Sequence, residues 1–355
     1  MTDLWTAVKD LPIAIESSSF ETLLPAGPTG LEDFSTTQLR LRGRGEEGVG
    51  EQVGMAATQE SLRVSDHPLT GEWATLSGFL AHLDTIDMWP EPPEYDLERH
   101  WRRWTFESAA LDLALRQAGT SLPEALGRVP QPVTFVNSFG LGDPPDIDKV
   151  ARRRARHPTV GFKLDVAPSW TQEVMDRIAA VEGVAVIDFK GQYGLEIADE
   201  AALLAMYERT VATFTDVVFE DPHDDPAVLA LLEPIAGRVS YDAPITTVES
   251  ISDTAITVGI VNVKPCRVGH LRELSRLYAH CESAGIQMYN GGMGELGAGR
   301  GQAQLLAALF HPHAPNDIAP SPYNLEDPPP GLPPSPLDPA PDRGFRRRAH
   351  GDGGR

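Results

Sequence analysis

From Pro132 onward, short apolar segments alternate with amphipathic helical segments, and this alternation limits the available folds more than any other feature. The apolar segments read VTFVNSFG, VGFKLDV, VAVIDFKG, DVVFEDP, VSYDAP, IVNVKP and IQMYNGG. Helix-start signals stand between them: Ser169 and Gln172 form a capping-box pattern, and Asp199 and Asp225 are further N-cap candidates. Repeated strand–helix units predict an α/β fold with a parallel sheet, and seven or eight units favour a modified, TIM-like (β/α)8-type barrel. An open doubly wound sheet is the alternative.

The first part of the chain has a different pattern, with strands ahead of helices. LPIAIES alternates as a strand does, and STTQLRLRGRGEEGVGEQVG predicts a hairpin around a glycine-rich turn. TFESAALDLALRQAG follows with apolar residues on one helical face and a closing Gly119. We therefore expect an α+β domain over residues 1–128 and the barrel over residues 129–325. Residues 326–355, rich in proline, glycine and charge, predict an extended strap and a disordered tail.

Composition narrows the function classes. The chain has 355 residues and 41% apolar residues, enough for two packed domains. Its net charge of -21 argues against binding to nucleic acid or to anionic membranes. No apolar run approaches the length of a membrane helix, and the first residues lack a secretory signal pattern. Two cysteines, Cys266 and Cys281, do not make a disulfide framework, so we expect a cytoplasmic protein with no membrane association.

Charged side chains stand where the apolar segments of the barrel half end. They are Lys163 and Asp165, Asp188 and Lys190, Glu220, Asp242, and Lys264, each set about one strand–helix unit after the last. In a barrel, these positions converge at the carboxyl ends of the strands, called here the barrel mouth, where barrel enzymes place their chemistry. A buried lysine such as Lys264 needs a partner or a function, because burying an unpaired ammonium group is costly.

Three of these side chains are carboxylates on consecutive strands: Asp188, Glu220 and Asp242. Close together in a site of low dielectric constant, they would repel one another. A hard divalent cation with oxygen ligands removes that repulsion, and Mg²⁺ is the natural candidate. Alternatively, each carboxylate caps a helix or pairs with an arginine.

Taken together, these segments resemble the enolase superfamily, in particular its muconate-lactonizing and mandelate-racemase-like members. VIDFKG, VFEDP and YDAP resemble the motifs that carry the three metal ligands, which implies that Asp188, Glu220 and Asp242 bind Mg²⁺. VNVKPCRVGHL resembles the segment with the sixth-strand catalytic lysine, here Lys264, and YNGGMGEL resembles the seventh-strand segment, here with Glu295. GVGEQVG resembles a Gly-x-Gly-Glu turn of the capping domain, and the segment 17–30 resembles its mobile lid loop.

The resemblance implies a reaction. In this superfamily a lysine removes the proton α to a substrate carboxylate, and the metal stabilises the resulting enediolate. The implied substrate is a small carboxylic acid, and a homo-oligomer is expected because the family commonly forms one. Glu295 and Asn290 are expected to bind substrate. GMGELG, just before a predicted helix, is a candidate anion site that Arg300 would assist.

The sequence departs from the family pattern at two strands. Relatives of this type have Lys-x-Lys on the second strand, but this chain reads Lys163-Leu164-Asp165. The third strand usually reads Asp-x-Asn, but here it is Asp188-Phe189-Lys190. Lys190 or Asp165 works opposite Lys264 in one interpretation, and in the other the two residues form a salt bridge and Lys264 acts alone.

Because racemization needs a base on each face of the substrate, the departure favours elimination by a lyase or dehydratase. A racemase, an epimerase or a cycloisomerase on the same scaffold is the alternative. A Schiff-base lyase that uses Lys264 and a non-catalytic carboxylate-binding relative are the rival classes. The sequence does not identify the substrate.

Overall fold

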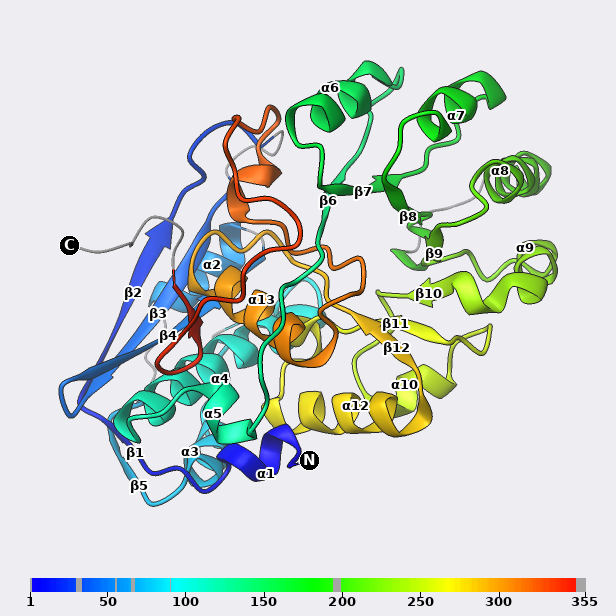
Figure 1. The fold of residues 1–355 in the computed structure, drawn as a ribbon. Helices are drawn as coiled ribbons and strands as arrows, with labels where there is room; N and C mark the ends of the chain where they lie inside the picture. The colour runs from blue at the N-terminus through cyan, green and yellow to red at the C-terminus, as the bar shows by residue number, and fades with distance from the viewer. Residues whose placement is uncertain are drawn as a thin grey trace.

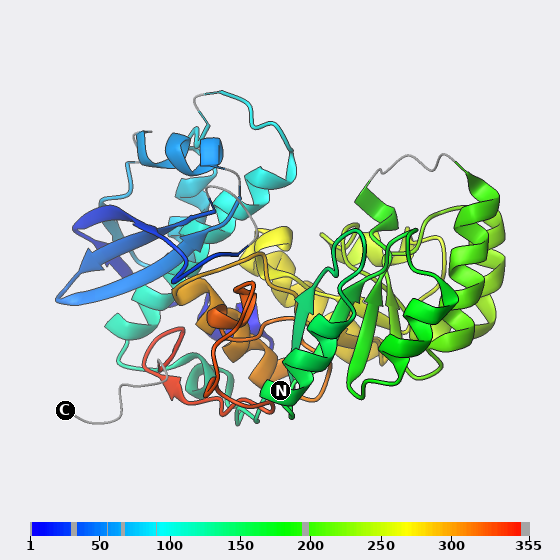
Figure 2. The ribbon, with the colours of Figure 1, turned by 90° about the horizontal axis from the view of Figure 1, so that it is seen from above.

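The computed structural model describes residues 2–29, 34–54, 56–64, 68–89, 91–193 and 199–348. An α+β capping domain packs beside a parallel β/α barrel (Figures 1 and 2). Among the described residues, no helix is both long and apolar enough to cross a membrane.

The capping domain combines a three-stranded antiparallel sheet, ordered β2–β3–β4, with five helices among its described residues. Its elements are α1 (Leu4–Val8), β1 (Ile13–Ile15), β2 (Ser17–Leu23), β3 (Thr36–Gly43), β4 (Glu46–Gln52), α2 (Ala56–Val64), β5 (Gly71–Trp73), α3 (Leu76–Leu83), α4 (Leu97–Gln117) and α5 (Leu122–Leu126). The expected hairpin is β3–β4, and its turn residues Arg44 and Gly45 both have positive φ. Of the segment that resembles a lid, residues 17–23 form β2, and Gly30 lies outside the described residues.

Two glycines let β4 lie directly against helix α4. An ideal Cβ on Gly48 would lie 2.3 Å from the carbonyl oxygen of Ala109, and one on Gly50 would lie 2.0 Å from that of Thr105. No side chain fits at such distances, so only glycine allows this approach. The Gly-x-Gly pattern is therefore a packing requirement, and it precedes a residue, Glu51, that contacts the barrel.

Seven parallel strands form the barrel, and each is hydrogen-bonded to the next in chain order. The strands are β6 (Val136–Phe139), β7 (Gly161–Asp165), β8 (Val184–Asp188), β9 (Val218–Glu220), β10 (Val239–Tyr241), β11 (Ile260–Asn262) and β12 (Gln287–Tyr289). The helical segments between and after them are α6 (Asp148–Arg156), α7 (Gln172–Ala179), η1 (Gly191–Tyr193), α8 (Glu200–Thr213), α9 (Pro226–Leu232), η2 (Glu233–Arg238), α10 (Val248–Ser252), α11 (Pro265–Val268), α12 (Leu271–Ala284) and α13 (Ala298–Phe310). Because the strand order never reverses, the sheet is not doubly wound, and the expected barrel with its capping domain is confirmed.

An eighth segment closes the ring between β12 and β6. Asn316 forms a parallel bridge to Phe135, and the next residue, Asp317, forms one to Gly291. The amide of Val136 supports the first bridge by donating a hydrogen bond to the Asn316 carbonyl oxygen at 2.8 Å. The closure is so short that it leaves no apolar strand pattern in the sequence.

Both ends of the described chain cross to the other domain. In helix α1, the amide of Trp5 donates to the Ser275 hydroxyl of barrel helix α12 at 2.8 Å. At the other end, the chain returns along the barrel to helix α4 (orange to red in Figure 1). The elements of this strap are η3 (Ser321–Asn324), β13 (Pro341–Asp342) and β14 (Arg346–Arg347).

A buried carboxylate fixes the strap to helix α4. Asp112 accepts hydrogen bonds from the Phe345 amide at 2.8 Å and from the Arg346 guanidinium at 2.6 Å. The Phe345 ring is fully buried and meets Trp104 edge-on. Residues 349–355 of the predicted tail lie outside the described residues.

Candidate active site

The charged residues at the strand ends form two neighbouring groups at the barrel mouth. The first contains Lys163 and Asp165 of β7, Asp188 of β8, Lys190 and Glu220 of β9. The second contains Asp242 after β10 and Lys264 after β11. Since β9 and β10 are paired in the sheet, the two groups are adjacent.

Lys163 lies at the centre of the first group. Its Nζ is 3.0 Å from Asp188, contacts Glu220, and is 3.6 Å from Asp317 in the closing segment. The side chains of Lys163, Asp188 and Glu220 are fully buried, and Glu220 also accepts a hydrogen bond from the Tyr289 hydroxyl. Burial alone would lower the pKa of Lys163, but the charges of Asp188 and Glu220 raise it well above its usual value. Lys163 therefore holds its proton and neutralises the carboxylates around it.

Lys190 joins the first group from its edge. Its Nζ contacts Asp188 Oδ2 and lies 3.4 Å from Asp165 Oδ1, and its amide donates to Asp188 Oδ1 at 3.0 Å. A φ of 55° places its backbone in the left-handed region. The salt bridge between Lys190 and Asp165 is therefore present, together with a second one to Asp188.

The second group is built around Asp242. Lys264 Nζ lies 2.8 Å from one oxygen of Asp242, and Arg267 contacts the other. The hydroxyl of Tyr193, from η1, is 3.3 Å from the oxygen that Lys264 contacts. Lys264 is 5% exposed and Arg267 is 2% exposed, so the buried strand-end lysine has a buried carboxylate partner.

The acids at the mouth differ in the direction in which their pKa values are shifted. Burial raises the pKa of Glu220 to about 8 and that of Asp221, the next residue, to about 6. Burial would also raise the pKa of Asp242, but Arg267 and Lys264 lower it well below its usual value. Lys163 offsets only part of the effect of burial at Glu220, whereas Asp242 has two cationic partners.

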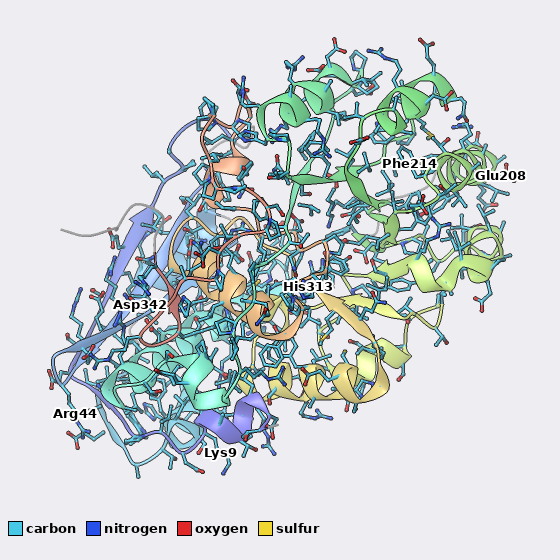
Figure 3. The ribbon with its side chains drawn as sticks, viewed as in Figure 1. Lys9, Arg44, Glu208, Phe214, His313 and Asp342 are labelled. Atoms are coloured by element: carbon cyan, nitrogen blue, oxygen red, sulfur yellow. The ribbon has the colours of Figure 1, made fainter. Side chains whose placement is uncertain are left out.

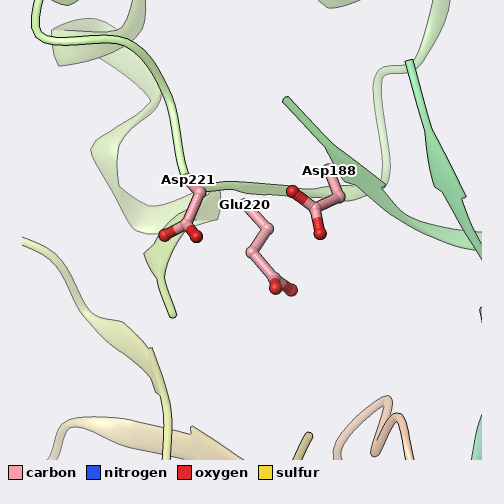
Figure 4. A group of neighbouring side chains, drawn as sticks. All are labelled: Asp188, Glu220 and Asp221. Atoms are coloured by element: carbon pink, nitrogen blue, oxygen red, sulfur yellow. The ribbon is translucent and has the colours of Figure 1, made fainter. Parts of the chain in front are cut away.

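Three carboxylates at the mouth are close enough to bind one cation, and two of them belong to the predicted set of ligands. Asp188, Glu220 and Asp221 each offer one oxygen, and the three oxygens lie within 4.8 Å of one another (Figure 4). Asp242, the third predicted ligand, has its oxygens on Lys264 and Arg267. Its role as a ligand stays a prediction.

This donor set fits a divalent metal. All of its atoms are carboxylate oxygens, which hard cations prefer. Among the described residues at the mouth, six carboxylates meet four cationic groups, so negative charge remains. The carboxylates are Asp165, Asp188, Glu220, Asp221, Asp242 and Asp317, and the cations are Lys163, Lys190, Lys264 and Arg267. A divalent cation would neutralise this excess.

The three residues predicted to bind substrate make contacts within the protein. The Glu295 carboxylate lies 3.1 Å from Arg300 and accepts a hydrogen bond from the Met293 amide. The buried Asn290 side chain donates to the carbonyl oxygen of Ala303 at 3.2 Å. Their substrate-binding roles stay predictions.

The predicted anion site at the start of helix α13 holds a carboxylate of the chain itself. Glu51 of β4 accepts hydrogen bonds from the amides of Leu296, Gly297 and Gly299 at 2.6, 3.0 and 2.8 Å. The Thr36 hydroxyl donates a further one at 2.7 Å. Glu51 thus connects the capping domain to the seventh loop of the barrel.

Sequence reasoning missed four residues of the mouth. Asp221 and Arg267 stood inside the quoted segments VFEDP and VNVKPCRVGHL, where a second charge beside Glu220 or Lys264 was the available signal. Asp317 and Tyr193 had no comparable signal. Asp317 lies in the two-residue closure, and Tyr193 lies in a short turn.

Comparisons with known proteins agree with the resemblance. The family described as "Domain of unknown function (DUF8230)" matches twice, its C-terminal domain over residues 129–325 and its N-terminal domain over residues 6–125. An N-succinylamino acid racemase from Thermus thermophilus is 32% identical over 60% of this chain, and the match spans 58% of that relative's length. An o-succinylbenzoate synthase from Geobacillus stearothermophilus is 27% identical over 79% of this chain and 76% of its own.

The fold is also shared with a solved structure. A member of the enolase superfamily from Listeria innocua superposes with a TM-score of 0.62 and 16% identity, over 87% of this chain and 86% of its own. At this identity the likeness concerns the fold alone.

Proposed function

Since this chain belongs to the DUF8230 family and shares its fold with enolase-superfamily structures, we propose that it is a metal-dependent enzyme that removes the proton α to a carboxylate of a small organic acid. We propose further that elimination follows. The proposal is supported by the buried strand-end lysine Lys264, which lies beside a set of carboxylates that fits a divalent cation.

Lys264 is the proposed base because it has fewer carboxylate partners than the other two lysines. Its Nζ pairs with Asp242 alone and lies 3.8 Å from the Met293 sulfur in the seventh loop. Lys163 contacts three carboxylates and Lys190 contacts two. Lys264 Nζ accepts the proton from the substrate α-carbon, the electron pair of the broken C–H bond forms the new C=C bond, and a leaving group departs from the β-carbon.

Asp188 and Glu220, with Asp221 or Asp242, are the residues that would hold a divalent metal such as Mg²⁺. When bound, such a metal stabilises the negative charge that develops on the substrate carboxylate. Lys163 keeps Asp188 and Glu220 in position through its contacts with both, and Arg267 with Tyr193 orients Asp242.

Racemization is the second candidate, favoured by the 32% identity to an N-succinylamino acid racemase. It requires a second base on the opposite face of the substrate. The candidate for this second base is Lys190, which follows β8 and is paired with both Asp188 and Asp165. Burial would lower its pKa, but the nearby carboxylates raise it above the usual value, which disfavours its use as a base.

Proton exchange in D2O distinguishes the two candidates. The protein with Mg²⁺ is incubated with N-succinylamino acids and with β-hydroxy acids that contain a succinyl group, because both sequence relatives have a succinyl group in their names and elimination needs a leaving group on the β-carbon. Elimination consumes the α-proton and yields an alkene signal in the NMR spectrum. Racemization instead gives both enantiomers with deuterium at the α-carbon. Metal binding without exchange or product on any acid would contradict the proposal.

A further inference from the structure

Lys190 bridges a fully buried carboxylate and a half-exposed one. The Asp188 side chain has no exposed surface, whereas the Asp165 side chain is 37% exposed and that of Lys190 is 34% exposed. Both contacts are made by the same Nζ, which lies 3.4 Å from Asp165 Oδ1 while it contacts Asp188 Oδ2. The ammonium group is therefore within reach of either partner.

Asp165 has an oxygen that could accept a hydrogen bond and does not do so from any residue that the structure describes. Within the described ranges, Asp165 Oδ1 is buried and accepts no hydrogen bond, although Lys190 Nζ is only 3.4 Å away. The Tyr193 ring has its centroid 5.5 Å from the same Nζ. A buried acceptor without a donor costs free energy, so closer approach of an ammonium group to Asp165 would be favourable.

A metal ion and Lys190 compete for the same oxygen. Asp188 Oδ2 is contacted by Lys190 and, at 3.0 Å, by Lys163. A cation that takes Asp188 as a ligand must displace an ammonium group from it. Lys163 is 1% exposed and also contacts Glu220, whereas Lys190 is 34% exposed and has Asp165 as a second partner within reach.

We propose that Lys190 is a built-in counter-ion of the metal site. It neutralises Asp188 when no metal is bound, and it moves to Asp165 when a divalent cation binds. This inference rests on the divalent metal of the proposed function. It goes beyond that function by giving one shared role to the two residues that depart from the superfamily pattern. In the metal-bound protein the ammonium group then lies at the end of β7.

A double-mutant cycle on Mg²⁺ affinity tests the exchange. Calorimetric titrations at fixed pH and ionic strength compare the wild type with Lys190→Met, Asp165→Asn and the double variant. Lys9→Met is the matched control, because Lys9 also pairs with an aspartate, Asp10, and lies far from the barrel mouth (Figure 3). If Lys190→Met fails to fold, Lys190→Asn replaces it, since asparagine tolerates the left-handed backbone at this position.

Removing the competitor should tighten binding, so Lys190→Met should bind Mg²⁺ at least about tenfold more tightly than the wild type. Asp165→Asn should weaken binding about threefold or more, because the displaced ammonium group loses its partner. In the Lys190→Met background, the same Asp165→Asn change should have no effect. Lys9→Met should match the wild type.

Two results would overturn the inference. Lys190→Met could bind Mg²⁺ no more tightly than the wild type, or Asp165→Asn could weaken binding equally with and without Lys190. If Asp188→Asn nevertheless lowers Mg²⁺ affinity, the metal site of the proposed function stands and only the counter-ion role fails. If neither the wild type nor any variant binds Mg²⁺, both proposals fail.

Discussion

Buried acids lie in two regions of this molecule, and different kinds of donor stabilise them in each region. At the domain interface, Glu51 is held by three backbone amides of the seventh loop and by one hydroxyl. At the barrel mouth, Asp188 and Glu220 are held mainly by lysine side chains. Glu51, Asp188 and Glu220 are all nearly inaccessible to solvent.

The difference lies in whether the donors can leave. Backbone amides are fixed by the fold, so the carboxylate of Glu51 is a permanent part of the domain contact. Ammonium groups on flexible stems can be replaced by another cation, so the carboxylates at the mouth can exchange their partners. Burial of acids is therefore not by itself a sign of a metal site, and the nature of the donors is the more informative observation.

The largest effect is expected from removing the proposed base. Lys264→Ala should reduce α-proton exchange by about 10²–10⁴-fold, the usual cost of losing a positioned acid or base. Mg²⁺ affinity should change little, because Lys264 contacts Asp242 and not the Asp188–Glu220–Asp221 trio. NMR exchange and calorimetry on the same preparation give both values, with Lys9→Ala, whose lysine pairs with Asp10, as control. Exchange at the wild-type rate would mean that another group is the base.

Removing an acid at the mouth should affect metal binding and not the domain contact. Asp188→Asn should lower Mg²⁺ affinity at least about 100-fold, because even residues that only support ligands typically cost 10–100-fold. Glu51→Gln should leave the affinity unchanged. Equal losses in the two variants would remove the distinction between exchangeable and fixed clusters.

A buried histidine beside the segment that closes the barrel should make stability depend on pH. His311, buried beside Asn316, has a pKa lowered by burial to about 4. Because the unfolded chain binds a proton more readily below pH 6.5, stability should fall as the pH decreases from 6.5. The expected loss between pH 6.5 and 5 is roughly 2 kcal/mol.

Urea unfolding at several pH values measures this loss. His311→Gln should show a smaller pH dependence than the wild type. The exposed His313 is two residues away (Figure 3), and His313→Gln should keep the wild-type slope. A slope that survives in His311→Gln would assign it to other groups.

A change at the domain interface should affect stability alone. Glu51→Gln keeps the shape of the side chain but turns an NH2 group toward backbone amide donors, so the free energy of unfolding should fall by about 1–3 kcal/mol. Glu60→Gln, on the exposed face of helix α2, is the control. Thermal unfolding with and without Mg²⁺ compares them, and a loss that Mg²⁺ alone reverses would connect Glu51 to the metal site after all.

The parts of the fold that could be predicted are those with a repeating pattern. Seven apolar segments separated by helix signals predicted the barrel, and the charges at their ends predicted which residues meet at the mouth. The eighth strand could not be predicted, because Asn316 and Asp317 close the ring through backbone bridges and need no apolar run.

The contacts between residues at the barrel mouth were harder to predict than which residues lie there. Asp188, Glu220, Asp242 and the lysines were expected near one another, but the sequence does not state which oxygen meets which nitrogen. Asp221 joins the trio because its positive φ of 48° turns its side chain away from the β-strand alternation. Glu51 occupies the start of helix α13 because Gly48 and Gly50 allow β4 to approach α4, a tertiary packing effect.

The crossing of both chain ends has a consequence for the order in which this protein can mature on the ribosome. Asp112, buried in the capping domain, meets Phe345 and Arg346 only 233 and 234 positions later in the chain. A nascent capping domain therefore emerges with an acid that still lacks these donors, and the whole barrel must be synthesised before they arrive. The domain made first is completed last, so release of nearly the full chain, and not translation of the first domain, sets the earliest moment of native assembly.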